Sequence, residues 1–216
     1  MTAWLDARGA EAESGAGAVG GYSHRVDLLD VAATMSAVEA SAKAMGGIDG
    51  VVNCAGLGSG APLENLDIEI WSKMIGVNLT APYVICRAAL PWLRKRHGAT
   101  IVNIASAQAL LPNAPGAAAY AASKGGLTTF TKALAAELAP HIRANVVCPG
   151  IVDTPMTRSI LERYQDPNSA PFIAQYAMKR VARPEEIATA VLYLTSDESS
   201  YVTGIAMAVD GGRTFH

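Results

Sequence analysis

The sequence is poor in the residues that build disulfide frameworks, metal sites and nucleic-acid interfaces. Its three cysteines (Cys54, Cys86 and Cys148) are odd in number and far apart, so we expect free, mostly buried thiols in a reducing, cytoplasmic compartment. Its four histidines show no spacing typical of metal ligands, so we expect no metal site. The formal net charge of -2 leaves no electrostatic footprint for nucleic acid.

Long apolar segments are also missing. No uninterrupted apolar run reaches the length of a membrane span, and no basic segment followed by an apolar run opens the chain. We therefore expect neither a membrane helix nor a signal peptide. The 216 residues, 50% of them hydrophobic, are enough for one full core, which predicts a single domain over residues 1–216.

Apolar strands and amphipathic helices alternate from residue 23 onward, whereas residues 1–22 are poorly defined. Within this first segment, 6–14 favours a short helix and 14–21 a loop. The alternation predicts an α/β fold with a doubly wound, mostly parallel sheet and helices on both faces. The predicted strands are 23–26, 48–53, 99–104, 142–148 and 205–209, and the predicted helices are 31–45, 67–96, 116–139 and 184–195.

Local signals support three of these elements. Asp30 and Asp67 are suited to cap the helices that follow them, and Pro82 and Pro91 should bend or interrupt the long helix over 67–96. The strand 48–53 is an apolar run without alternation, which predicts burial on both of its faces.

The stretch from Ser106 to Lys124 carries the strongest chemical signal. Ser106 follows a buried strand, and Tyr120 and Lys124 lie four residues apart on the next helix, so they share one face. A Ser hydroxyl facing a Tyr–Lys pair suits proton transfer to a carbonyl oxygen or from an alcohol. A nearby ammonium favours the phenolate of a tyrosine, whose free pKa of about 10 is too high for a good base. The Tyr-x-x-x-Lys spacing is common by chance. Whether this pair is catalytic therefore depends on the motifs around it.

Polar and turn residues follow three predicted parallel strands at Asn53, Ser106 and Pro149–Gly150. Parallel doubly wound sheets bind ligands beyond the carboxyl ends of their strands, which predicts one crevice lined by all three. The alternative is that strand ends simply need turn residues.

Taken together in order and spacing, these motifs resemble the short-chain dehydrogenase/reductase family, from about Asp27 to the C-terminus. The matching segments are Asn53-Cys54-Ala55-Gly56, Asn78, Ser106, Tyr120 with Lys124, Pro149-Gly150-Ile151-Val152-Asp153-Thr154 and Val209-Asp210-Gly211-Gly212. The resemblance implies a Rossmann-like fold and an oxidoreductase that transfers a hydride between NAD or NADP and a small carbonyl or alcohol substrate.

The resemblance also implies residue roles. Tyr120 would be the general acid/base, Ser106 would hold the substrate oxygen, and Lys124 would lower the Tyr120 pKa and hold the nicotinamide ribose. Asn78 would hold a water of the proton relay, in a helix distorted ahead of Pro82. Besides Tyr120 and Lys124, the implied cofactor contacts are Asp27 at the adenine ring, Asn53, Ala55, Gly56, Pro149, Gly150, Val152 and Thr154. The segment 150–182 would cover the substrate.

The sequence departs from the family at its start. The family's Thr-Gly-x-x-x-Gly-x-Gly turn, whose N–H groups approach the pyrophosphate, is missing, so the chain resembles an N-terminally truncated member. Asp6 lies roughly where the acid that selects NAD over NADP is expected. We therefore expect a sheet that lacks its first one or two strands and leaves 48–53 at an open edge. Three outcomes are open. The strands on either side of the gap close up and pair, a partner chain covers the edge, or the sequence is a truncated form.

Three functions compete at this point. The first is the nicotinamide-dependent oxidoreductase, the second a non-catalytic remnant or interaction subunit with weak or no dinucleotide binding, and the third a cofactor-free lyase or isomerase that uses Tyr120. The resemblance also implies a homodimer or homotetramer through the helices over 67–96 and 116–139.

Overall fold

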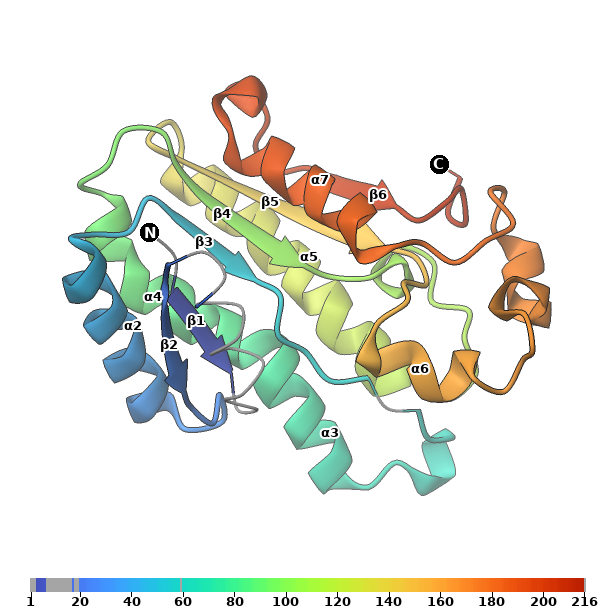
Figure 1. Cartoon of the computed structure of the whole chain (residues 1–216). Coiled ribbons are helices and arrows are strands. Elements are labelled where there is room, and N and C mark those ends of the chain that lie inside the picture. The colour runs from blue at the N-terminus through green and yellow to red at the C-terminus, as the bar shows by residue number, and fades with distance from the viewer. Residues whose placement is uncertain (1–2, 7–16, 18–19, 59, 216) are drawn as a thin grey trace.

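A four-stranded parallel sheet forms the centre of the protein (Figure 1). The computed structural model describes residues 3–6, 17, 20–58 and 60–215. The strands are β3 (Gly50–Asn53), β4 (Ala99–Ile104), β5 (Ile142–Pro149) and β6 (Ala206–Val209), which pair in this order and all run parallel. The predicted α/β fold with a mostly parallel sheet is confirmed.

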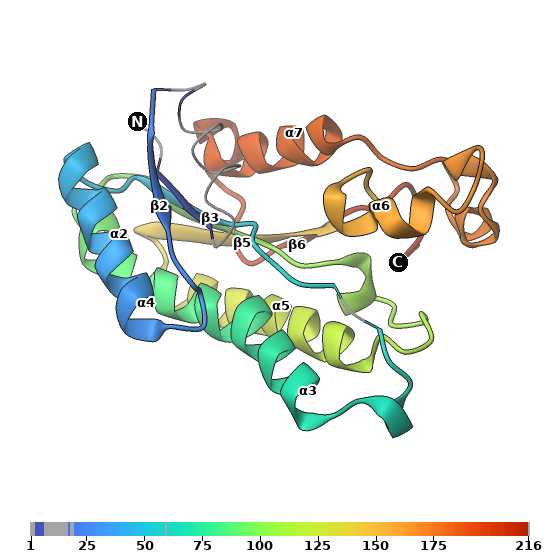
Figure 2. The same ribbon diagram turned by 60° about the horizontal axis from the view of Figure 1, so that its bottom comes forward.

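Helices cover both faces of this sheet (Figure 2). On one face lie α2 (Val31–Met45), α4 (Ala81–Leu93) and α5 (Ala118–Leu138), and on the other lies α7 (Pro184–Thr195). Each face of the sheet has its own hydrophobic core. Consecutive side chains of β4 point into different cores, because side chains alternate along a strand. Ile101 packs with residues of α2, α4 and α5, whereas Val102 packs with Leu194 of α7.

The predicted caps are present. The carboxylate of Asp30 accepts a hydrogen bond from the N–H of Ala33 at 2.9 Å, and Gly46 ends α2 with a φ of 74°. The carboxylate of Asp67 accepts from the N–H of Ile70 at 2.7 Å and opens α3 (Ile68–Ile75). These helix ends are therefore fixed by local sequence.

The predicted single helix over 67–96 is interrupted where Pro82 was expected to distort it. A π-helical turn, η2 (Gly76–Thr80), separates α3 from α4, whereas Pro91 lies inside α4 and does not interrupt it. Pro82 has no N–H, so it cannot donate the bond that the carbonyl of Asn78 would receive in a regular α-helix. The wider turn places the Asn78 side chain inside the protein.

The N-terminal flank forms a separate unit of two strands. β1 (Ala3–Asp6) and β2 (Tyr22–Arg25) pair in parallel with each other, and both contact α2. The predicted helix over 6–14 is wrong at Asp6, which lies in β1, and its other positions fall outside the described residues. Within the described part of the chain, β2 does not pair with β3, so the flanking strands do not close up.

Burial on both faces of β3 is also a wrong prediction. Val51 is 8% exposed but Val52 is 46% exposed. The reason is tertiary: α7 packs against β4, β5 and β6, and no described helix covers β3 on that side. Apolar content alone does not reveal which strand of a sheet a helix reaches.

The segment 150–182 contains the helix α6 (Pro155–Leu161) and two 3-10 turns, η4 (Pro167–Ser169) and η5 (Pro171–Gln175). Ala170, Ile173 and Tyr176 form a small core of its own. Further 3-10 turns are η1 (Leu63–Asn65), η3 (Ala107–Ala109) and η6 (Asp197–Ser199). None of the described helices is long and apolar enough to cross a membrane.

Candidate active site

The end of β4 presents Ser106 to the helix α5. The Ser106 hydroxyl caps η3 by accepting a hydrogen bond from the N–H of Gln108 at 3.1 Å. The same hydroxyl lies close enough to the Tyr120 phenol to oppose the rise that burial causes in its pKa. The strand end and the first turn of α5 therefore meet at two side chains that the sequence predicted to face each other.

Lys124 lies one turn further along α5 and is 4% exposed. Its Nζ donates a hydrogen bond to the carbonyl oxygen of Ile104 at 2.8 Å, which pins the ammonium to the end of β4. Nζ also lies 6.0 Å from the centroid of the Tyr120 ring. The structure thus brings Ser106, Tyr120 and Lys124 together.

Burial governs the ionisation of these groups. It raises the pKa of Tyr120, an effect that the hydrogen bond with Ser106 reduces and the nearby Cys148 thiol adds to. It lowers the pKa of Lys124 from 10.5 to about 8, although Cys54 and Cys148 oppose this shift. Burial is the largest influence on the Tyr120 pKa and the Lys124 ammonium is directed at Ile104, so the lowering of the Tyr120 pKa by Lys124 stays a prediction.

Asn78 completes what we call the polar cluster (Asn78, Ser106, Tyr120 and Lys124). It is fully buried, which excludes an ordinary helix-surface residue. Its Nδ2 donates to the carbonyl of Leu57 at 2.9 Å and to Oγ of Ser123 at 3.0 Å, with Sδ of Met74 at 3.1 Å. Its Oδ1 accepts from the N–H of Leu57 at 2.8 Å.

Gly56 lies against this cluster. A Cβ atom at Gly56 would lie 3.2 Å from Oδ1 of Asn78 and 3.3 Å from Nζ of Lys124. Both distances are tighter than ordinary contacts, so glycine allows the loop after β3 to approach the ammonium closely. Ala55, beside it, is exposed.

Asn53 is directed away from the cluster. Its Nδ2 donates to Oδ1 of Asn103 at 2.7 Å, and the Asn103 amide in turn donates to Oγ1 of Thr131 at 2.8 Å. This buried network ties β3, β4 and α5 together below the crevice. The side chain of Asn53 is therefore a structural support at the strand end. Cys54, expected among mostly buried thiols, is exposed, whereas Cys86 and Cys148 are buried.

Asp27 lies outside the cluster, on the N-terminal flank after β2. It is exposed, and its Oδ1 accepts a hydrogen bond from the N–H of Leu29 at 3.0 Å, as a turn residue does. The structure does not bring it into contact with the other predicted site residues.

Pro149, Gly150, Val152 and Thr154 form the base of the segment 150–182. A Cβ at Gly150 would lie 2.8 Å from the ring of Tyr176 and 3.0 Å from the backbone of Asp210, so only glycine fits there. Val152 bridges to Ala182, and Thr154 caps α6 through Thr157. These residues fix both ends of the segment beside the end of β5. Pro149, at that strand end, is half-buried.

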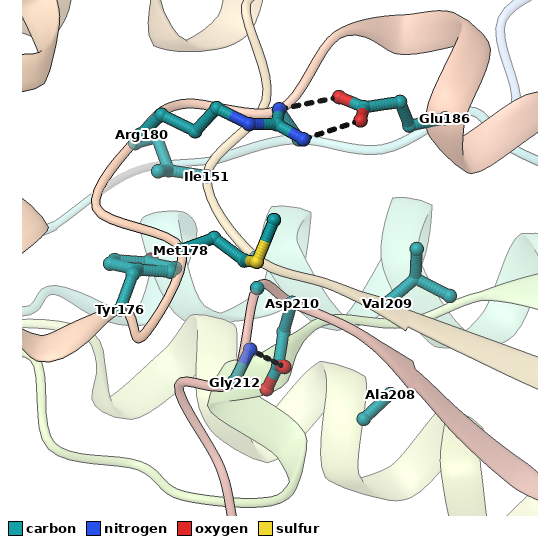
Figure 3. Close-up of a pocket in the computed structure, with 12 residues that line it drawn as sticks. Ile151, Tyr176, Met178, Arg180, Glu186, Ala208, Val209, Asp210 and Gly212 are labelled. Carbon is teal, nitrogen blue, oxygen red and sulfur yellow. Dashed lines mark hydrogen bonds and ion pairs between the residues drawn. The ribbon is translucent and has the colours of Figure 1, made fainter.

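A cavity of about 230 Å³ lies beside this base (Figure 3). Arg180 and Glu186 form an ion pair of 2.7 Å at one side of the cavity. Tyr176 and Met178 also line the cavity. The Asp210 carboxylate accepts from the N–H of Gly212 at 3.0 Å. The lining includes no member of the polar cluster. Over the described ranges, no group of three or more His, Cys, Asp and Glu side chains could hold a metal ion.

Ser123 is a site residue that sequence reasoning missed. Its hydroxyl donates to the backbone carbonyl of Tyr120 at 2.7 Å and accepts from Asn78. Its position before Lys124 placed it on the helix, but its contact with a residue 45 positions earlier has no signal in the sequence.

Comparisons with known proteins identify relatives over most of the chain. The family described as "Enoyl-(Acyl carrier protein) reductase" matches residues 2–214. "Inactive 2-(S)-hydroxypropyl-CoM dehydrogenase 2" of Xanthobacter autotrophicus is 37% identical over 98% of this chain and 94% of its own length. Cyclopentanol dehydrogenase of Comamonas sp. is 42% identical over 77% of this chain, a match that spans 66% of that relative.

Solved structures extend the likeness to the whole fold. The structure of 3-ketoacyl-(acyl-carrier-protein) reductase from Brucella melitensis, complexed with NADH, superposes with a TM-score of 0.89. It is 32% identical, and the superposition covers 99% of this chain and 87% of that one.

Proposed function

The chain belongs to the short-chain dehydrogenase/reductase family, and we propose that it transfers a hydride between NAD or NADP and a small carbonyl or alcohol substrate. The observation that carries the proposal is the polar cluster, in which the Ser106 hydroxyl lies close enough to the Tyr120 phenol to affect its pKa and the Lys124 ammonium lies 6.0 Å from the Tyr120 ring. A substrate oxygen beside Ser106 and Tyr120 receives two hydroxyl donors at once, which stabilises the charge that develops there.

Tyr120 acts as the proton donor and acceptor. Because burial raises its pKa, the phenol keeps its proton at neutral pH and can give it to the alkoxide formed from a carbonyl. Alcohol oxidation needs the reverse transfer, so that direction gains rate as pH rises. Ser106 orients the reacting oxygen and supports the phenolate by its hydrogen bond.

Lys124 and Asn78 supply the rest of the proton path. The Lys124 ammonium is held at the end of β4 and offers two further N–H donors to a ribose hydroxyl. The Asn78 side chain is fully bonded, so its backbone carbonyl, which Pro82 cannot serve, is the acceptor that would hold a relay water.

The residues at the carboxyl ends of β3, β4 and β5 fit the nicotinamide end of the cofactor. Gly56 leaves room for close backbone approach, and Tyr120, Lys124 and Thr154 offer donors. The hydride itself is the chemistry of the nicotinamide. We place the adenine end of the cofactor near Asp27, on the N-terminal flank.

The segment 150–182 covers the substrate side. Met156 of α6 lies over the loop after β3, since a Cβ at Gly58 would lie 3.2 Å from its Sδ. Met156 and Ile160 are exposed apolar side chains on this helix. They favour a small substrate with an apolar part.

The second candidate function is a non-catalytic member of the family. It is favoured by the printed name of the Xanthobacter relative, which calls that protein inactive. Titration with NADH and NADPH, followed by fluorescence or calorimetry, separates the two. Micromolar binding, with turnover that Tyr120→Phe abolishes, supports the oxidoreductase. Absent or millimolar binding supports the non-catalytic form, or a cofactor-free enzyme if Tyr120→Phe still removes an activity.

We also propose a homodimer or homotetramer in a reducing, cytoplasmic compartment. Exposed apolar side chains on η1, α3 and α4, namely Leu63, Ile68, Trp71 and Tyr83, favour contact between copies there. Light scattering that returns the 22.4 kDa mass of one chain would contradict the assembly.

A further inference from the structure

Ser123 is a fully buried hydroxyl at the junction of three segments. Its Oγ donates to the carbonyl of Tyr120 at 2.7 Å and accepts from Nδ2 of Asn78 at 3.0 Å. In an α-helix that same carbonyl also receives the N–H of Lys124. Ser123 thus joins the π-helical turn η2 to the part of α5 that carries the proposed acid/base.

The hydroxyl, together with the backbone of Leu57, fixes which way the Asn78 amide faces. Its own hydrogen is used on Tyr120, so it can only accept from Asn78, and the amide must turn Nδ2 toward it. In that orientation Oδ1 accepts from the N–H of Leu57 and Nδ2 donates to the carbonyl of Leu57. The reversed amide would set two donors against each other at Leu57, and two buried acceptors would lose their partners.

Through Leu57, the amide holds the loop after β3. Asn78 satisfies both backbone polar groups of Leu57, as a paired strand would. Gly56, the preceding residue, lies beside Lys124, since a Cβ atom there would lie 3.3 Å from Nζ. The loop that the Asn78 amide holds therefore contributes to the burial of Lys124, which is 4% exposed.

We propose that Ser123 is a positioning residue, whose hydroxyl helps to hold the Asn78 amide and, through it, keeps residues 55–58 in place beside Lys124. Its effect on rate rests on the proposed function, whereas the position of the loop is a property of the fold. Loss of the hydroxyl removes one of the bonds of the amide, loosens the loop and admits water to Lys124. Its pKa, lowered to about 8 by burial, then moves up toward 10.5.

The test is Ser123→Ala, matched by Ser41→Ala. Ser41 is also buried in a helix, and its hydroxyl donates only to the carbonyl of Ala37 at 2.8 Å, far from the polar cluster. We expect Ser123→Ala to lower kcat/KM about tenfold, to move the alkaline limb of the pH profile upward and to speed hydrogen exchange over 55–58. Ser41→Ala should change none of these readouts.

A double-mutant cycle shows whether Ser123 acts through Asn78. In an Asn78→Ala background, Ser123→Ala should add little, whereas independent effects would multiply and overturn the proposal. Unchanged exchange over 55–58 in Ser123→Ala would also overturn it. If the wild-type chain shows no turnover, the proposed function fails, but exchange still tests Ser123. Should Ser123→Ala not fold, Asn78→Asp removes the donors to Ser123 and to the carbonyl of Leu57, and unchanged exchange over 55–58 in that variant would overturn the proposal.

Discussion

The two flanks of the sheet differ in how completely the chain's own side chains fill them. On one flank, which we call the closed flank, Asn78, Ser123 and Lys124 around the ends of β4 and β5 are buried and hydrogen-bonded. On the other, which we call the open flank, Asp27 and Val52 around β2 and β3 are exposed, and these two strands do not pair in the described structure. The chain therefore builds the groups for proton chemistry from within, and leaves the side proposed for the adenine end open.

Tyr120→Phe gives the sharpest test of the closed flank. Deleting the hydroxyl removes the proton donor but keeps the buried ring, so we expect kcat to fall about 10³-fold. Affinity for NADH or NADPH, measured by fluorescence, should stay within a few-fold. Tyr201→Phe is the matched control, because Tyr201 is fully exposed and should leave the rate unchanged. Equal rates for both variants would rule out a catalytic role for Tyr120.

Lys124→Met should separate activity from stability. The loss of the ammonium should lower kcat by at least about 10²-fold. The variant should nevertheless be more stable at pH 7, because the folded chain keeps a buried lysine charged there. The fall in pKa from 10.5 to about 8 corresponds to about 3 kcal/mol, and the lost bond to Ile104 offsets about 1 kcal/mol.

The difference in stability between Lys124→Met and the wild type should shrink as pH rises. The lysine pKa is lower in the folded chain, so the unfolded chain binds more protons between pH 8 and 10.5. Wild-type stability therefore rises through this window, and the gain of Lys124→Met of about 2 kcal/mol shrinks across it. Urea unfolding at pH 7 and pH 10 measures both values. A gain that is the same at both pH values would mean that burial of the charge is not its source.

Val51 and Val52 sharpen the comparison within one strand. They are neighbours of the same type, one facing the core and one facing the open side of β3. Val51→Ala should cost about 2 kcal/mol in the free energy of unfolding, and Val52→Ala about 0.5 kcal/mol. Denaturant unfolding of both variants checks this. Equal costs would show that something covers the open side of β3 in solution.

Sequence predicted the closed flank better than the open one, for physical reasons. β4 and β5 are long apolar runs, α2 carries its own caps, and the Tyr120–Lys124 spacing follows from helix geometry. The exposure of Val52 depends on how far α7 reaches across the sheet, which no local pattern encodes. The bond between Asn78 and Ser123 spans 45 positions, and the burial that sets the Tyr120 pKa exists only after packing.

Asp27 should give the smallest effect, because the open flank holds it loosely. Asp27→Asn keeps an acceptor for the N–H of Leu29 and removes only an exposed charge, so cofactor affinity should change less than about threefold. Asp27→Ala also removes the acceptor, and should weaken binding about fivefold. Calorimetric titration of NADH into both variants and the wild type gives the comparison. A loss of affinity beyond tenfold in Asp27→Asn would mean that the carboxylate is an essential ligand of the adenine end. Both flanks would then contribute side chains that bind the cofactor.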